Sequence, residues 1–175
     1  MGKTRHYAGI GSRQTPQEVC NIITKIAKLL EEKNYVVRSG GAEGADHAFT
    51  LGVTAQVFKA ADCRVWALEE VKKHFPIDRR VKQFDSWKPY VKSLLGRDMM
   101  QILGEDGKDQ VDFVLCWAPS LNYKDSSAGG TGWAIRCALN YNIPVFNLFD
   151  RAIPSSTPQG LLEYILGGMP PLTPK

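Results

Sequence analysis

The chain has 175 residues, of which 43% are hydrophobic, so it is long enough for one compact domain with a sizeable core and leaves little room for a second. Its formal net charge of +4 is mild, and overall charge alone therefore predicts no nucleic-acid binding. No apolar stretch approaches the roughly 20 residues of a membrane span, and no signal peptide precedes the first expected strand. We expect no membrane partner and a reducing, cytoplasmic location.

Neither cysteine nor histidine spacing indicates a metal site. The four cysteines form no CxxC pair and lie in apolar segments: Cys20, Cys63, Cys116 and Cys137. We expect them to be reduced, buried and structural. The three histidines, His6, His47 and His74, lack metal-ligand spacing, so we expect no metal ligand among them and no cofactor.

The first element is a strand over residues 5–10, and glycine, serine and proline in "GSRQTP" end it. An amphipathic run then predicts a helix with apolar residues on one face and charged residues mostly opposite. Thr15 is the expected N-cap, Pro16 the first helical residue, and Glu18 the residue that completes a capping box.

Strands and helices are expected to alternate along the rest of the chain. The further strands are expected at residues 35–39, 63–68, 111–117 and 143–148, and the helices at 45–61, 90–103 and 132–141. This alternation predicts an α/β fold: a doubly wound, mostly parallel, Rossmann-like sheet of about five or more strands. We expect the domain to occupy residues 1–150, and residues 151–175 to form a tail with one short helix and a loose end.

Two glycine-rich loops follow expected strands, where parallel sheets bind ligands. They contain Gly40, Gly41 and Gly44 in the first loop and Gly129, Gly130 and Gly132 in the second. Glycines let backbone approach a phosphate, and a helix start offers free N–H groups. The alternative is that they only form tight turns, but two such loops with Arg13 beside a third favour a site. GxGxxG is absent, so a dinucleotide-dependent Rossmann enzyme is not indicated.

Charged residues near these loops have two interpretations. Asp46 and Glu43 are either first-turn carboxylates favoured by the helix dipole or groups with a catalytic or ribose-binding role. Residues 72–90 interleave basic and aromatic side chains, which suits phosphates and stacked bases. The alternative, which we favour slightly, is a solvated insertion over about residues 69–90 whose aromatic side chains anchor it to the core.

Three segments carry a family resemblance: "YAGIGSRQTP", "YVVRSGGAEGADHAF" and "GGTGWAIRCALNYNIPVFNL". They resemble the signature regions of the SLOG superfamily, and most closely its DNA-processing protein A (Smf) branch, in a compact form like that of phages and prophages. The resemblance spans about residues 5–149 and lapses over 69–90. It implies a Rossmann-like fold that binds nucleotides or nucleotide-derived ligands, a homodimer or higher homo-oligomer, and a bacterial or phage-infected cell.

A second branch, the LOG phosphoribohydrolases, is more distantly similar. It cleaves the N-glycosidic bond of nucleoside monophosphates, and Arg97 matches its arginine by position. Its two glutamates fall on Ile135 and Arg136 here, so another carboxylate would have to stabilise the developing positive charge. Glu43, Asp46 and Asp98 are the candidates.

The DNA-processing branch implies single-stranded DNA bound through its G-S-R arginine, which is Arg13 here. Glu43 occupies a usually basic position of that branch, and a carboxylate at short range repels a phosphate by on the order of 1 kcal/mol or more. A small ligand with hydroxyl groups is therefore favoured over extended DNA.

The leading hypothesis is binding of a nucleotide-derived ligand that serves as a signal to be sensed or sequestered. Its ligand-binding residues are Gly11, Ser12, Arg13, Ser39, Gly40, Gly41, Gly44, Asp46, Gly129, Gly130, Thr131 and Gly132. Cleavage of a nucleotide N-glycosidic bond, with Arg97, Asp46 and Glu43 as catalytic residues, and single-stranded DNA binding in recombination or DNA protection remain alternatives.

Overall fold

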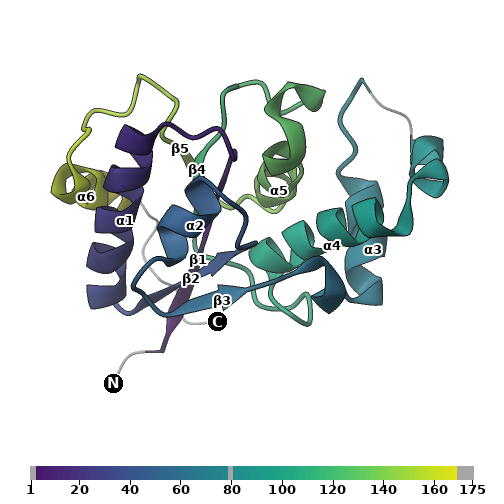
Figure 1. Ribbon diagram of the computed structural model, residues 1–175, viewed down its shortest axis with the longest axis horizontal. Coiled ribbons are helices and arrows are strands. Elements are labelled where there is room, and N and C mark those ends of the chain that lie inside the picture. The colour runs from purple at the N-terminus through teal and green to yellow at the C-terminus, as the bar shows by residue number, and fades with distance from the viewer. Residues whose placement is uncertain (1–2, 79–80, 169–175) are drawn as a thin grey trace.

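The computed structural model describes residues 3–78 and 81–168, and its centre is a five-stranded parallel sheet (Figure 1). The strand order is β3-β2-β1-β4-β5. The strands are β1 (Arg5–Gly11), β2 (Tyr35–Ser39), β3 (Ala55–Val57), β4 (Val114–Trp117) and β5 (Val145–Asn147). Each pairs in parallel with its neighbour, so all strands end at the same edge of the sheet.

Helices cover both faces of this sheet. One face packs against α1 (Gln17–Glu32), α2 (Ala45–Thr50) and α6 (Pro158–Gly167), and the other against α3 (Val65–Lys73), α4 (Pro89–Leu103) and α5 (Gly129–Asn140). Alternate strand residues serve the two cores: Tyr7 and Leu115 point to the α1 side, and Ala8 and Val114 to the α4 side. The expected doubly wound α/β fold is confirmed.

The predicted third strand is wrong. Within the expected strand, residues 65–68 begin α3, and the edge strand β3 lies at Ala55–Val57, inside the segment expected to continue the helix from residue 45. Helix α2 ends at Thr50 because Gly52 takes a φ of +74°, which turns the chain back toward the sheet edge. In α3 only one side is buried, with Ala67 inside and Val65 80% exposed, which is a helical burial pattern.

The predicted N-cap of α1 is also wrong. The helix begins at Gln17, and no side chain caps it among the described residues. The Thr15 hydroxyl instead donates to the carbonyl of Ser12 at 2.6 Å. Thr15 therefore stabilises the turn after β1, because its hydroxyl group acts as a donor there instead of accepting a helical N–H.

The C-terminal segment contains the expected short helix. Leu161, Leu162 and Ile165 of α6 are buried in the core beside α1. The expected loose end, residues 169–175, lies outside the described residues. No helix of the described part is both long and apolar enough to cross a membrane. All four cysteines are free, and Cys63 is partly exposed instead of buried as expected.

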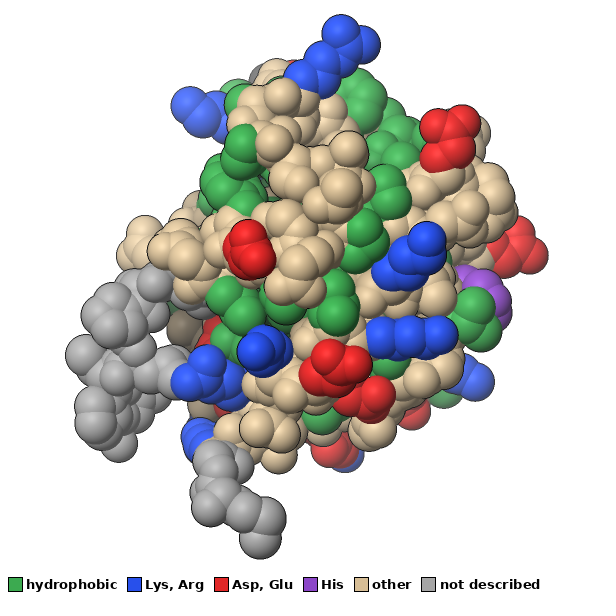
Figure 2. Space-filling view, turned by 90° about the vertical axis from the view of Figure 1, so that its left-hand side faces the viewer, with side chains coloured by type: hydrophobic (Ala, Val, Ile, Leu, Met, Phe, Trp, Pro, Cys, Tyr) green, Lys and Arg blue, Asp and Glu red, His purple; other side chains and the backbone are tan. Residues whose placement is uncertain are grey.

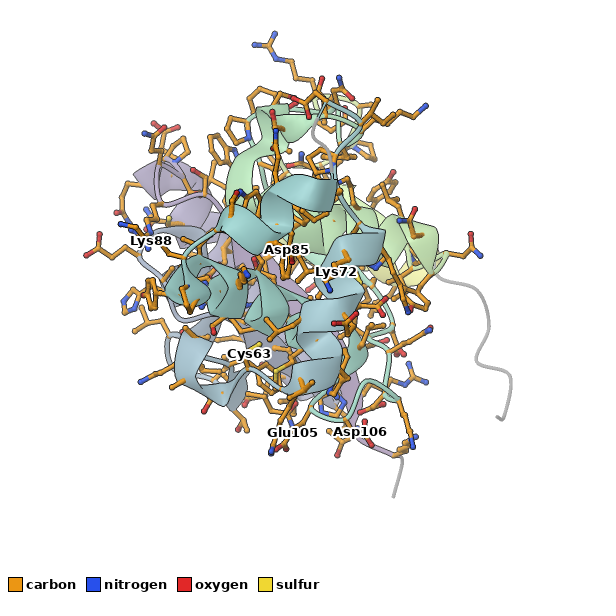
Figure 3. All side chains as sticks on the ribbon, turned by 90° about the vertical axis from the view of Figure 1, so that its right-hand side faces the viewer. Cys63, Lys72, Asp85, Lys88, Glu105 and Asp106 are labelled. Atoms are coloured by element: carbon orange, nitrogen blue, oxygen red, sulfur yellow. The ribbon has the colours of Figure 1, made fainter. Side chains whose placement is uncertain are left out.

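The aromatic side chains of the basic segment anchor it to the core. Phe75 lies 4.9 Å from the ring of Trp133, and Phe84 and Trp87 pack around Phe75 at ring distances of 6.1 and 5.5 Å. The expectation that these aromatic side chains anchor the segment to the core is thus supported. Arg79, Arg80 and the side chain of Lys82 lie outside what is described. Figure 3 shows both charge signs on this side of the molecule.

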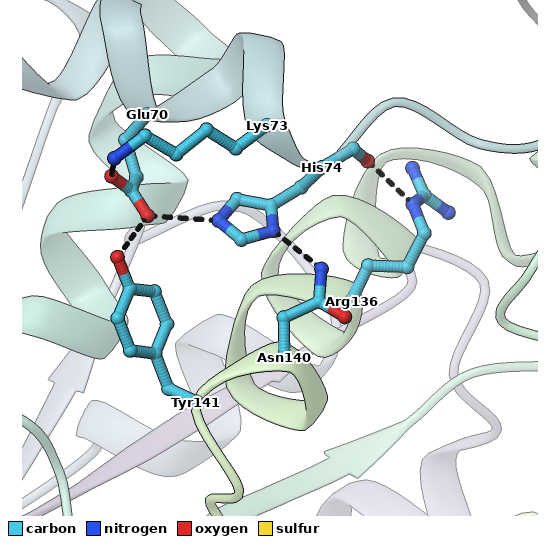
Figure 4. A network of polar contacts seen from close by, with 6 residues as sticks. All are labelled: Glu70, Lys73, His74, Arg136, Asn140 and Tyr141. Atoms are coloured by element: carbon cyan, nitrogen blue, oxygen red, sulfur yellow. Dashed lines mark hydrogen bonds and ion pairs between the residues drawn. The ribbon is translucent and has the colours of Figure 1, made fainter.

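A buried polar network joins α3 to α5 (Figure 4). The Glu70 carboxylate lies 2.9 Å from Nε2 of His74 and accepts the Tyr141 hydroxyl at 2.5 Å. Nδ1 of His74 lies 2.8 Å from the Asn140 amide nitrogen. Sγ of Cys137 is within 4.8 Å of the Glu70 and His74 ligand atoms, a spacing that could hold a metal ion. The hydrogen bonds already give Glu70 and His74 partners, so we interpret the network as an internal clamp.

The clamp predicts loss of stability in acid. Burial lowers the pKa of His74, so below about pH 6.5 the unfolded chain takes up a proton that the folded chain does not. Burial alone would raise the pKa of Glu70, but hydrogen bonds from Tyr141, His74 and Lys73 lower it. Protonation of Glu70 therefore causes a further loss of stability at still lower pH.

His74→Gln should therefore lose less stability than the wild type between about pH 7 and pH 5, as measured by urea unfolding. His47→Gln is the matched control, because His47 is exposed on α2. Parallel pH profiles for wild type and His74→Gln would contradict this account of the clamp.

Candidate functional site

A cavity of about 470 Å³ opens at the carboxyl edge of the sheet. It lies next to the β1 and β4 ends, where the strand order changes direction and Gly11 pairs with Trp117. The loops after these strands diverge at such a point and leave a crevice between them. The turn after β1, helix α4 and the start of α5 form its walls.

Asp46 fixes the end of β1 to the loop after β2. This carboxylate is 5% exposed and accepts N–H hydrogen bonds from Gly11 at 3.1 Å and Ala42 at 3.4 Å. Burial raises its pKa to about 6, although Ala42, the charge of Arg97 and Gly11 favour the ionised form. Asp46 also lines the cavity, so it is both a structural acceptor and a group that a ligand can contact.

Arg97 reaches the same corner from α4. Its Nη1 donates to the carbonyl groups of Gly40 at 2.7 Å and Phe58 at 3.3 Å, and Nε donates to Asp98 at 3.0 Å. A Cβ on Gly40 would lie 2.4 Å from Nη1 of Arg97, so only glycine permits this approach. Nη2 has no hydrogen bond to a described residue and remains a donor beside the cavity.

Asp98 is the second carboxylate of the cavity wall. Its side chain is 14% exposed. Burial, opposed by Arg97 and assisted by the charge of Asp46, raises its pKa to about 7. Near neutral pH, Asp98 can therefore either accept a hydrogen bond or donate one.

The start of α5 forms the opposite wall. Gly129, Gly130 and Thr131 line the cavity at the first turn of this helix. No described side chain caps that turn, and the Gly129 N–H donates to the carbonyl of Ser126, so the N–H groups that follow, from Gly130 on, are the ones open to ligands or solvent. Gly129 has a φ of +62°, a conformation that glycine adopts readily. With the exposed Arg13 on the β1 side, this wall combines an arginine with helix N–H donors.

The structure brings together only part of the predicted site. The predicted residues that line the cavity are Gly11, Ser12, Arg13, Asp46, Arg97, Gly129, Gly130 and Thr131. The predicted residues outside its described lining are Ser39, Gly40, Gly41, Glu43, Gly44 and Gly132. The first glycine loop instead packs internally, with Gly40 against Arg97 and Gly44 against the backbone of Ser12. Glu43 is exposed to solvent.

Sequence reasoning missed one wall of the cavity. Val91, Leu94, Leu95 and Gln101 of α4 line it together with Asp98. Leu94, Leu95 and Asp98 follow Val91 by three, four and seven residues, which places all four on one face of the helix. This spacing was the signal in the sequence that could have found the wall.

One solved structure resembles the whole fold. The DNA processing protein A of Helicobacter pylori, described for its single-stranded DNA binding, superposes with a TM-score of 0.56 at 18% sequence identity. The match covers 94% of this chain and 73% of that protein. No protein-family model and no curated protein matches the chain. At this identity the likeness establishes a shared α/β fold.

The desolvated Asp98 predicts a stabilising substitution. Between about pH 4 and pH 7 the folded protein retains a proton that the unfolded chain releases, so the stability of the wild type falls as the pH rises through this window. Asp98→Asn removes the ionisation and can still accept the Arg97 bond.

At about pH 8 we expect Asp98→Asn to unfold with a free energy higher by about 1 kcal/mol or more, with little difference at about pH 4. Thermal or urea unfolding across this range measures it. Asp106→Asn, on the exposed loop after α4, is the control. Equal stability of Asp98→Asn and wild type at pH 8 would show that the carboxylate is well solvated.

Proposed function

We propose that the cavity binds a nucleotide or a nucleotide-derived small molecule. The observation that carries this proposal is the pairing, in one crevice, of an uncapped helix start and Arg13 with two partly desolvated carboxylates. The helix start and Arg13 suit a phosphate group, and the two carboxylates suit sugar hydroxyls or base N–H groups. The cavity volume of about 470 Å³ is in the range of small-molecule sites.

The phosphate is assigned to the start of α5. Gly129 and Gly130 carry no side chain to shield the helix start, the N–H of Gly130 is the first that Ser126 does not accept, and the helix dipole favours an anion there. Arg13 supplies a positive charge from across the crevice, and the Thr131 hydroxyl is a further donor. This differs from the expectation that both glycine loops hold phosphate, because the first loop packs against Arg97 and Ser12.

The sugar and base are assigned to the α4 side. Asp98 and Asp46 provide acceptors for hydroxyl groups, and Val91, Leu94 and Leu95 provide apolar surface for a base. A second phosphate at this end would meet two carboxylates with only Arg97 between them, which opposes binding of a polyphosphate in that direction. The arrangement therefore favours a ligand with its phosphate at the α5 end.

The first test is native mass spectrometry of freshly purified protein, with identification of any molecule released on denaturation. A co-purified nucleotide would support the proposal and report the subunit count that the family resemblance implies. If the protein is empty, calorimetric titration with the common nucleoside monophosphates replaces this test. Absence of binding to every nucleotide in both experiments would refute the proposal.

Loss of the arginine should weaken phosphate binding. We expect Arg13→Ala to raise the Kd of the bound nucleotide by roughly 10-fold or more, because a hydrogen bond to a charged group contributes about 1.5–3 kcal/mol. Arg151→Ala is the matched control, since Arg151 is exposed and lies outside the described lining of this cavity. An unchanged Kd in Arg13→Ala would remove Arg13 from the site.

Single-stranded DNA binding is a second candidate, favoured by the likeness to DNA processing protein A and by the exposed Arg13. Against it, both carboxylates of the crevice oppose a phosphate backbone. The face in Figure 2 also intersperses Lys and Arg with Asp and Glu, so it offers no uniformly basic track. Oligonucleotide affinity that falls roughly tenfold or more between low and physiological salt would favour DNA as the ligand.

Cleavage of the N-glycosidic bond is a third candidate, favoured by the raised pKa of Asp98 beside the crevice. A carboxyl group that titrates near neutral pH can serve as a general acid. Release of free base from a nucleotide panel, followed by chromatography, tests it. Activity that persists in Asp98→Asn would exclude Asp98 as that acid.

A further inference from the structure

A second hollow continues the cavity on the far side of the α5 start. It has a volume of about 510 Å³ and shares Val91, Leu95, Gly129 and Gly130 with the first cavity. Apart from its chain neighbours and the backbone of its own helix, a Cβ built on Gly129 or Gly130 would have no described atom within 4 Å. The surface between the two hollows is therefore glycine backbone, which no described side chain covers.

The second hollow differs in chemistry from the first. Its remaining wall comes from Ser86, Trp87, Lys88, Ser126 and Trp133. Trp87 is half-buried, and its ring is held by Phe75 at 5.5 Å and Trp133 at 5.8 Å, so it is a rigid aromatic surface. Lys88 is exposed at the rim and lies apart from Lys72 in Figure 3. Aromatic surface beside a lysine suits a stacked base next to a phosphate.

Combining the two hollows, we infer that the groove takes a dinucleotide: one nucleoside in the first cavity, a second base against Trp87, and the bridging phosphate over Gly129 and Gly130. This inference rests on the proposed nucleotide function and specifies its ligand. The N–H groups of the α5 start lie at the junction of the two hollows, where the linking phosphate would be. The carboxylates remain at the end that holds hydroxyl groups.

The order of charges along the groove supports this assignment. Asp46 and Asp98 lie in the first cavity, and the described lining of the second contains a lysine and no acidic residue. A single phosphate between two bases places its negative charge away from both carboxylates. A longer strand would need further phosphates beyond one end, and at the first end they would meet Asp98.

The experiment compares three ligands by calorimetry at constant salt. They are the best-binding nucleoside monophosphate, the 3′–5′ dinucleotide of that nucleoside, and an eight-residue oligonucleotide of the same base. We expect the dinucleotide to bind roughly tenfold or more tighter than the mononucleotide, because stacking of one more base adds affinity on this scale. The oligonucleotide is expected to bind no tighter than the dinucleotide.

Variants then assign the gain to the second hollow. Trp87→Ala should abolish the dinucleotide advantage and leave the Kd of the mononucleotide unchanged. Tyr90→Ala is the control, because Tyr90 is an aromatic residue of α4 that is 67% exposed and outside the described lining of both hollows. If Trp87→Ala does not fold, Lys88→Ala replaces it, since Lys88 is exposed and lines only the second hollow, and its loss should weaken the dinucleotide more than the mononucleotide.

The outcomes separate the two levels of the proposal. Mononucleotide and dinucleotide Kd values that are equal would overturn the dinucleotide inference and leave the nucleotide function standing. An advantage that survives both Trp87→Ala and Lys88→Ala would place the second base elsewhere and also overturn it. Affinity that keeps rising with oligonucleotide length would identify a DNA strand as the ligand instead. No binding of any of the three would refute the nucleotide function itself.

Discussion

The contacts of Arg97 and Asp46 at the carboxyl edge of the sheet hold the rest of the site in place. Arg97 joins α4 to the segments that follow β2 and β3 through Gly40 and Phe58, and Asp46 joins the segment after β2 to the end of β1. An arginine and two carboxylates are thereby withdrawn from water beside the crevice. Their mutual attraction compensates part of the desolvation cost, and the raised pKa values of Asp46 and Asp98 show that part of it remains.

The desolvation cost that remains on these carboxylates links the stability of the fold to the chemistry of the site. A carboxyl group that titrates near pH 7 destabilises the folded chain at neutral pH, and the same property lets it exchange a proton with a ligand. Functional sites commonly retain such costs while the surrounding structure compensates for them. Here the compensation comes from two well-packed cores, one on each face of the sheet, which hold β1 and β4 side by side.

The segment between α3 and α4 packs against α5, whose first turn lines the crevice. Its aromatic side chains pack around Trp133 of α5, and the Glu70–His74 pair is bound to Asn140 and Tyr141 at the other end of the same helix (Figure 4). Helix α5 is thus held near both ends by this segment and by α3. The same helix offers its first turn to the crevice, so the clamp helps fix the position of the proposed phosphate site.

The sequence by itself determined the parallel α/β class, strands β1 and β2, and the glycine-bearing turns, because these depend on local periodicity and backbone freedom. It could not locate β3, a three-residue edge strand whose pairing with β2 is a long-range contact. Nor could it tell which glycines face a ligand: Gly40 serves the approach of Arg97, whereas Gly129 and Gly130 face open space. Only tertiary packing decided this, since it determines which atoms lie opposite each bare Cα.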